Sequence, residues 1–262
     1  MSLFSRIFDT LRERAFNSNS LLCQIVKNIG IGRFVFRIRI YSFKVENLVG
    51  HYNQRHIEYP WVLHKLGSGQ ARTLLDVGCG GSLLAHELLA RGFRVVGLDI
   101  RDHTIRNYRE VFVKANAINT ELPSESFDVI VLLSTIEHIG LPGYSQDLLK
   151  DDGDFLTMQE LRRLLKRNGI LVLTTPFEGK GPLRIHRFGK DFDLFERRYD
   201  TERLARLLEG FEVIDSAFFL CMLNCKCKFV PIEKHILDKL SSKITEGSLA
   251  CLILRKLEKQ AS

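Results

Sequence analysis

The segment Asp76–Ser82 (DVGCGGS) has the composition of a loop that holds a nucleotide-like ligand. Gly78 and Gly80 lack a Cβ, so the backbone there can approach a ligand closely. A helix that begins after such a turn offers its free N–H groups to the ligand. Asp99 lies 23 residues after Asp76, at the end of the next expected strand, where its carboxylate can accept hydrogen bonds from both hydroxyls of a ribose. The loop and Asp99 together predict an adenosine-type cofactor.

The spacing of the glycines distinguishes between two kinds of adenosine cofactor. A dinucleotide-binding loop needs glycines at relative positions one, three and six. Those positions are Gly78, Gly80 and Leu83 here, so the third glycine is missing. Asp76 also places a negative charge beside the turn, which is unfavourable next to a pyrophosphate and favourable near a cationic methionine moiety. These features favour S-adenosylmethionine over a dinucleotide.

The elements that must position these residues begin at Thr73, where short apolar runs alternate with helical patterns. This alternation predicts an α/β fold with a doubly wound, mainly parallel sheet, and we expect seven strands. Two helices are expected, each stopped by a glycine-containing turn, and two later β-rich runs could pair at one sheet edge. The expected strands are Thr73–Val77, Arg94–Leu98, Val111–Lys114, Phe127–Leu133, Ile170–Thr175, Phe211–Phe219 and Leu249–Leu254, and the helices are Leu83–Arg91 and Phe155–Arg167.

Four segments in this order resemble the motifs of class I S-adenosylmethionine-dependent methyltransferases. Leu74–Ser82 (LLDVGCGGS) is similar to motif I of that family, and Val96–Ile100 (VGLDI) to motif II. Leu122–Ile139 (LPSESFDVIVLLSTIEHI) resembles the motif IV region, and Leu161–Pro176 the helix and strand that follow it. The match covers about residues 57–220. It implies an enzyme that transfers a methyl group from S-adenosylmethionine.

Three further stretches are similar to one poorly characterised microbial branch of that class. They are Ile136–Tyr144, Asp151–Asp154 and Glu196–Phe211. Some members of the branch are linked to glycan or lipid modification. The resemblance therefore implies a hydroxyl of a glycan- or lipid-linked acceptor as the first expectation, with a small-molecule acceptor as the second.

The resemblance also implies which residues bind the cofactor. The motif I residues should line its methionine and ribose side, Asp99 should hold the ribose hydroxyls, and Ile100 should lie against the adenine. Asn116 and Ala117 stand where the family often has Asp-Ala beside the adenine amine, and the amide of Asn116 keeps an acceptor oxygen. The full expected set is Asp76, Gly78, Cys79, Gly80, Asp99, Ile100, Asn116, Ala117 and Ser134.

Two residues after the fourth strand are candidates for catalysis. Methyl transfer to a hydroxyl needs a base, and histidine side chains titrate at roughly pH 6.5. His138 follows the strand over the expected methyl site, so it is the candidate base, unless it only shapes the pocket. Glu137 could instead position the substrate or the methionine end of the cofactor. Asp128, at the start of the strand, is expected to be structural.

Two other segments could contact ligands. Arg55, Glu58, Tyr59 and Trp61 precede the first strand, a segment that often caps the cofactor in this class, although the aromatic residues could equally pack on the sheet. Residues Arg184–Arg198 combine basic side chains with three phenylalanines and could bind an anionic acceptor. The alternative for this second segment is a surface insert that packs through its phenylalanines.

Positive charge is concentrated at the start of the chain. Residues 1–50 hold eight Lys/Arg and three Asp/Glu, which is +5 of the net charge of +7. We expect a basic helical extension over residues 1–50 and the methyltransferase domain over residues 51–262. The extension could contact an anionic membrane surface, or could simply be a solvated basic face. Because no apolar run is long enough to span a bilayer, we expect a cytoplasmic protein that is peripheral to a membrane at most.

The sequence gives weaker signals for a metal site and for two other functions. Of Cys221, Cys225 and Cys227, the last two are separated by a single residue, which is too close for the usual zinc pairs, so no metal is expected. The net positive charge would suit an RNA- or DNA-directed methyltransferase, but the tetrapeptide Asn/Asp-Pro-Pro-aromatic of amino-directed enzymes is missing after the fourth strand. A non-catalytic cofactor-binding scaffold is the other alternative. The intact Asp76 and Asp99 argue against it.

Overall fold

The computed structural model describes residues 54–80, 82–102, 112–143, 151–179, 184–188, 194–222, 228–239 and 248–258. The predicted basic extension over residues 1–50 lies outside this part of the chain, and so do Cys225 and Cys227. No helix among the described residues is long and apolar enough to cross a membrane.

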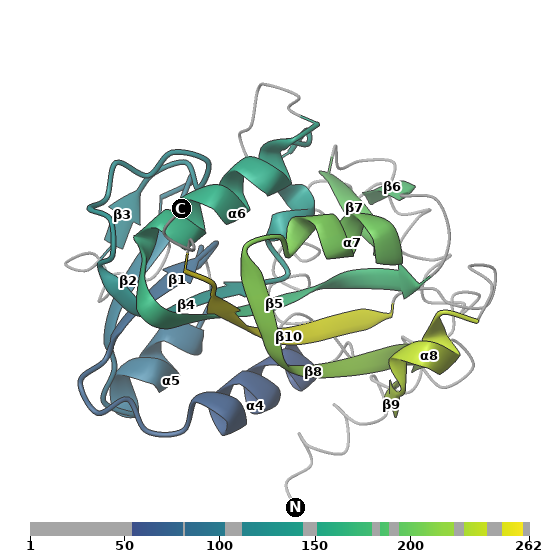
Figure 1. Ribbon diagram of the computed structural model, residues 1–262, viewed down its shortest axis with the longest axis horizontal. Coiled ribbons are helices and arrows are strands. Elements are labelled where there is room, and N and C mark those ends of the chain that lie inside the picture. Colours follow the sequence, from purple (N-terminus) through teal and green to yellow (C-terminus); the bar gives the residue numbers. More distant parts are fainter. Residues whose placement is uncertain are drawn as a thin grey trace, which may run out of the picture. The chain divides into compact units, whose positions relative to one another are not determined.

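Five parallel strands form one half of the sheet, in the order β3-β2-β1-β4-β5 (Figure 1). The central strands β1 and β4 are mostly apolar and almost entirely buried, as expected for strands that are covered on both faces, whereas the edge strand β3 is only partly buried. The strands β1 and β4 have the predicted bounds. The five are β1 (Thr73–Val77), β2 (Arg94–Asp99), β3 (Phe112–Lys114), β4 (Phe127–Leu133) and β5 (Leu165–Gly179).

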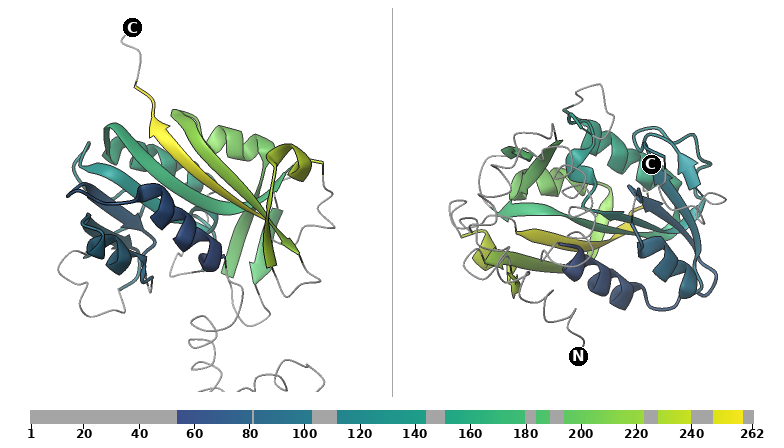
Figure 2. Two further views of the ribbon diagram at one scale, coloured as in Figure 1. Left: turned by 90° about the horizontal axis from the view of Figure 1, so that it is seen from below. Right: turned by 180° about the vertical axis from the view of Figure 1, so that it is seen from behind.

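The other half of the sheet is antiparallel. β10 (Leu249–Lys256) lies between β5 and β8 (Phe211–Met222) and runs antiparallel to both, so the two late β-rich runs do pair. Figure 2 shows these three long strands side by side. β9 (Lys228–Ile232) pairs with β8.

The expected number of seven strands is wrong, because the described residues form a ten-stranded sheet. The three unpredicted strands are β9, β6 (Arg184–Phe188) and β7 (Leu194–Asp200). β7 pairs in parallel with the end of β5, and β6 pairs with β7 in antiparallel orientation. The described parts of the charged segment, residues 184–188 and 194–198, thus pair with each other as added strands, which the sequence pattern did not predict.

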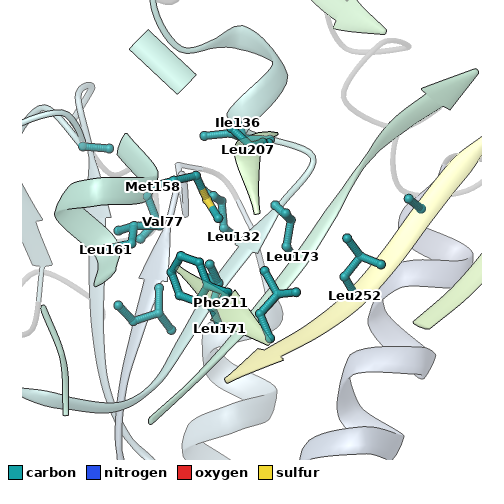
Figure 3. Close-up of a cluster of buried hydrophobic side chains, with 14 of the residues drawn as sticks. Val77, Leu132, Ile136, Met158, Leu161, Leu171, Leu173, Leu207, Phe211 and Leu252 are labelled. Atoms are coloured by element: carbon teal, nitrogen blue, oxygen red, sulfur yellow. The ribbon is translucent and has the colours of Figure 1, made fainter. Parts of the chain in front are cut away.

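Helices cover both faces of the sheet (Figure 1). α4 (Arg55–Leu66) and α5 (Leu84–Ala90) contribute Val62, Leu66, Leu84 and Leu88 to one buried apolar cluster. α6 (Gly153–Leu164) and α7 (Thr201–Leu207) contribute to the second cluster on the opposite face. Figure 3 shows how side chains of α6 and α7 meet those of the central strands there. The sheet is therefore doubly wound, as predicted.

The expected boundary between α6 and β5 is wrong. The helical pattern predicts a helix to Arg167, but α6 ends at Leu164 and β5 begins at Leu165. Leu165 pairs with Phe127 of β4, and its carbonyl accepts a hydrogen bond of 2.6 Å from Lys256 Nζ. Pairing with the sheet outweighs the local helical preference there, and the register shift before Ile170 accommodates the turn at Asn168, where φ is 58°.

Asp128 joins the starts of three strands, which agrees with its expected structural role. Its carboxylate accepts hydrogen bonds from Thr73 N at 2.8 Å, from Thr73 Oγ1 at 2.7 Å and from Lys166 Nζ at 2.9 Å. Partial burial raises the pKa of Asp128, but the hydrogen bonds from Thr73 and Lys166 outweigh it and lower the pKa to about 2.

We expect Asp128→Asn to remove part of the acid sensitivity of the fold. The lowered pKa means that ionised Asp128 stabilises the folded state above about pH 4, and that this contribution is lost as the pH falls towards about 2. The free energy of unfolding, measured by urea titration from pH 7 to pH 2.5, should be lower in Asp128→Asn at pH 7 and should fall less steeply below pH 4. Glu121→Gln, on the exposed loop before β4, is the control. Parallel curves for Asp128→Asn and the wild type would contradict this role.

Candidate functional site

A cavity of about 250 Å³ lies at the carboxyl ends of β1, β2 and β4. Ligands of doubly wound sheets bind at this edge. Gly78, Gly80, Asp99, Ile100, Asn116, Ala117, Ser134 and His138 of the expected site line the cavity, together with Arg55, Val77, Arg101, Ala115, Thr135 and Ile139. Asp76, Cys79 and Glu137 of the expected set do not line it.

The turn after β1 has no space for larger side chains. Gly78 has a φ of 76°, which favours glycine, and a Cβ there would lie 2.4 Å from Thr135 Oγ1 in the turn after β4. A Cβ on Gly80 would lie 2.5 Å from Asp99 Oδ2. Both glycines are therefore required by the close approach of neighbouring turns, and they leave backbone rather than side chains along this part of the cavity wall.

Asp99 is buried at the end of β2, with an exposed fraction of 5%. Its Oδ2 accepts a hydrogen bond of 2.8 Å from Gly80 N, and its Oδ1 accepts one of 2.9 Å from Arg101 N. The Arg101 guanidinium lies 3.3 Å from Oδ1. The carboxylate is thus fixed by two backbone N–H groups at the wall of the cavity, where its remaining lone pairs can accept ligand hydroxyls.

Asp76 is buried immediately before the turn, and its Oδ2 has no hydrogen-bond partner among the described residues. Burial raises the pKa of Asp76 to about 7, the Arg55 guanidinium opposes this shift and the Asp99 carboxylate adds to it. A buried carboxylate oxygen without a partner is costly unless a ligand or a proton satisfies it. The position therefore fits a cofactor that carries positive charge.

The helix α4 closes one side of the site. Arg55 lines the cavity and donates to Leu133 O at 3.0 Å and to Glu58 Oε2 at 3.0 Å. Glu58 is fully buried and also accepts hydrogen bonds from Ser134 Oγ and Thr174 Oγ1. Tyr59 Oη lies 2.8 Å from Ser82 Oγ. These residues hold α4 against the turns after β1 and β4.

Not every residue of the α4 segment faces the cavity. Trp61 packs against the apolar cluster that α4 and α5 share, and Lys65 Nζ lies 6.0 Å from its ring centroid. Glu58 lies beneath the cavity and does not line it. Arg55 is thus the one member of the expected quartet that the structure places in the cavity wall.

His138 and Glu137 lie in different surroundings. Both belong to the short 3-10 helix η2 (Ile136–His138) after β4. His138 lines the cavity, and its backbone N–H donates to Thr135 O at 3.0 Å. Glu137 is 1% exposed and lies 3.5 Å from Thr175 Oγ1. Burial, with the nearby Glu196 and Glu58 carboxylates, raises the pKa of Glu137 well above its usual range.

Two residues of the expected cofactor set have partners within the protein. Cys79 is fully buried in the apolar cluster beneath the turn, and burial raises the pKa of its thiol. Asn116 Oδ1 accepts a hydrogen bond of 3.0 Å from Ile118 N, which fixes the turn that places Asn116 and Ala117 at the cavity. The acceptor oxygen expected to meet an adenine amine therefore already has one donor.

Sequence reasoning did not single out Arg101 and Thr135, which line the cavity. Thr135 lies within the motif IV match, and the neighbouring Ser134 has a φ of 39°, a conformation that is uncommon outside glycine. Arg101 follows Asp99 directly. Its place in the sequence, next to the residue expected to hold the ribose hydroxyls, is the signal that could have identified it.

Comparisons with known proteins agree with this geometry. A family model described as "Methyltransferase domain" matches residues 75–173. A ubiquinone biosynthesis O-methyltransferase of Rickettsia akari is 26% identical over 218 residues, 73% of this chain and 82% of that protein. The protein of the same name from Rickettsia felis is 34% identical over 222 residues, 71% of this chain and 83% of that protein.

The chain belongs to the class I S-adenosylmethionine-dependent methyltransferases.

Solved structures show that the fold is that of S-adenosylmethionine-dependent methyltransferases. The Burkholderia thailandensis 1,6-didemethyltoxoflavin-N1-methyltransferase, with bound 1,6-didemethyltoxoflavin and S-adenosylhomocysteine, has a TM-score of 0.56 and 18% identity, and the match covers 86% of this chain and 87% of that one. A Methanosarcina mazei S-adenosylmethionine-dependent methyltransferase also has a TM-score of 0.56, with 16% identity over 76% of this chain and 98% of that one. This methyltransferase therefore uses S-adenosylmethionine as its cofactor.

We expect Asp76 to make cofactor binding by this methyltransferase depend on pH. Ionised Asp76 attracts the sulfonium of S-adenosylmethionine, whereas S-adenosylhomocysteine lacks that charge. Because the pKa of Asp76 is about 7, the ratio of the two affinities should rise by roughly three- to fourfold from pH 6 to pH 8, for an interaction of about 1 kcal/mol. Calorimetry with both ligands measures the ratio. In Asp76→Asn the ratio should not change with pH, and a wild-type ratio that is equally flat would contradict the assignment.

Proposed function

We propose that this methyltransferase transfers the methyl group to a hydroxyl oxygen of its acceptor, and that His138 removes the hydroxyl proton. The observation that carries the proposal is that His138 lines the same cavity as Gly78, Asp99 and Ser134. The two Rickettsia relatives, whose names describe O-methyltransferases, support oxygen as the acceptor atom.

The lining of the cavity supports one orientation of the bound cofactor, with its adenine and its methionine at opposite ends. Asp99 would accept the ribose hydroxyls, with Ile100, Asn116 and Ala117 on the adenine side. Gly78, Gly80 and Ser134 would line the ribose and methionine side, with Asp76 behind the turn as the charge that favours the sulfonium. Cys79 would contribute through its backbone, since its side chain packs in the core.

The reaction is a displacement at the methyl carbon. The acceptor oxygen forms a bond to that carbon, the bond from carbon to sulfur breaks with its electron pair moving to sulfur, and S-adenosylhomocysteine leaves. His138 takes the hydroxyl proton on an imidazole nitrogen. The protein contributes mainly alignment of the oxygen with the methyl group and removal of this proton.

Glu137 suits positioning better than proton removal. It does not line the cavity. Burial raises its pKa well above the usual range, which favours the neutral acid. Thr175 Oγ1 donates a hydrogen bond of 3.5 Å to Glu137 Oε2, which links η2 to β5.

The relatives favour a small aromatic acceptor over the glycan- or lipid-linked acceptor expected first. Their names refer to ubiquinone, which is a ring compound with oxygen substituents. A phenolic hydroxyl is therefore the acceptor class that we propose for this chain. Methylation of RNA or DNA has no specific support from the site.

We expect His138→Ala to keep cofactor affinity and to lose turnover. Without the base, release of S-adenosylhomocysteine should fall by about 10²- to 10⁴-fold, measured with a catechol acceptor, a glycan and an RNA oligonucleotide in parallel. His64→Ala, on the exposed side of α4, is the matched control and should behave like the wild type. Unchanged turnover in His138→Ala would remove His138 from this role, and turnover with the glycan or RNA alone would overturn the acceptor class.

A further inference from the structure

We propose that Arg197 is a positioning residue that fixes η2 and thereby aims His138 at the cavity. This inference rests on the proposed role of His138 as the base. Arg197 belongs to β7 and is 1% exposed. It is far from the cofactor loop in sequence. The sequence suggests that its segment, Arg184–Arg198, could bind an anionic acceptor, but the Arg197 side chain is buried inside the protein.

Arg197 binds the backbone directly after the proposed base. Its Nη1 donates a hydrogen bond of 2.6 Å to the carbonyl of Ile139, which follows His138. Hydrogen bonds from a charged donor are shorter and about twice as strong as neutral ones. The carbonyl of His138 also accepts from Leu141 N at 3.1 Å. The backbone on the carboxyl side of His138 is therefore held at two successive carbonyls.

A buried carboxylate in α6 fixes the guanidinium in turn. Asp154 is 0% exposed, and its Oδ2 lies 3.8 Å from Arg197 Nε and 3.0 Å from Tyr199 Oη. Arg203 pairs with the same carboxylate at 2.9 Å from the more exposed side. The carboxylate is thus the ion-pair partner of two arginines.

The start of α6 also packs closely on this backbone. A Cβ on Gly153 would lie 2.9 Å from Gly140 Cα and 3.0 Å from Ile139 O. Gly153 and Arg197 therefore both contact the segment Ile139–Gly140. Tyr199 Oη lies 3.5 Å from Ile136 O, at the other end of η2. Displacement of Arg197 would free the carboxyl end of η2 in the direction of β7.

Arg197 and Arg203 differ in what they contact besides Asp154. Arg203 and Arg197 share Asp154, but Arg197 also donates to the Ile139 carbonyl directly after η2, whereas Arg203 donates to the Asp151 carbonyl before α6. Removal of either arginine should cost stability, because it leaves buried Asp154 with one ion-pair partner fewer. The interaction that distinguishes Arg197 is therefore the one with the carbonyl beside His138.

The pair Arg197 and Arg203 provides the experiment. In Arg197→Met, kcat should fall by about tenfold or more, as expected when a catalytic group is misplaced by about 1 Å, and the Kd of S-adenosylhomocysteine should stay within twofold. Arg197→Lys should lie between Arg197→Met and the wild type. Arg203→Met, the matched control, should lose thermal stability but retain kcat with the catechol acceptor.

An NMR signal supplies a readout that does not need an acceptor. With ¹³C-labelled histidine and bound S-adenosylhomocysteine, the His138 resonance, assigned by its loss in His138→Ala, should shift in both Arg197 variants and stay unchanged in Arg203→Met. Should Arg197→Met not fold, Arg197→Lys serves alone, because its shorter side chain cannot reach both Asp154 and Ile139.

The outcomes distinguish the two proposals. Wild-type kcat together with an unchanged His138 resonance in a folded Arg197 variant would overturn the positioning role. The same would follow if Arg203→Met lowered kcat and shifted the resonance as much as Arg197→Met does, since the effect would then be one of general stability. Full turnover in His138→Ala would instead overturn the proposed function, whatever the Arg197 variants show.

Discussion

The site depends on one buried carboxylate, that of Glu58. An isolated buried charge is too costly to persist, and Glu58 has partners on three elements: Arg55 on its own helix, Ser134 after β4 and Thr174 on β5. These bonds fix α4 at the carboxyl edge of the sheet. They place Arg55 in the cavity wall and let Tyr59 reach Ser82. By holding α4, Glu58 thus fixes the cavity wall against the turn after β1 and the turn after β4.

The sheet supplies the second constraint, because parallel strands bring distant residues to one edge. β1, β2 and β4 end with Asp76, Asp99 and Ser134 nearby, and the intervening turns approach so closely that only glycine fits at Gly78 and Gly80. The two carboxylates at this edge have different partners. Asp99 is held by backbone N–H groups, whereas Asp76 keeps an oxygen without a partner among the described residues. This contrast suits a cofactor with hydroxyls at one end and positive charge at the other.

Local patterns predicted those parts of the fold that local residues determine. The apolar runs of β1 and β4 predict their observed bounds because each is broken by only a single aspartate and ends at a turn. The start of β5 was missed because pairing of Leu165 with Phe127 outweighs a good helical pattern. The roles of Glu58 and Arg197 could not be predicted either. Their partners lie as many as 116 positions away in sequence, and only the assembled sheet brings them together.

We infer that Asp99 holds S-adenosylmethionine in the cavity beyond β1, β2 and β4, and calorimetry can test this role. Titration of S-adenosylmethionine into the wild type and into Asp99→Ala should give saturable binding to the wild type and an affinity weaker by about tenfold or more in the variant, for loss of a charge-assisted hydrogen bond worth about 1.5–3 kcal/mol. Equal affinity in the two proteins, or no binding to the wild type, would contradict the account.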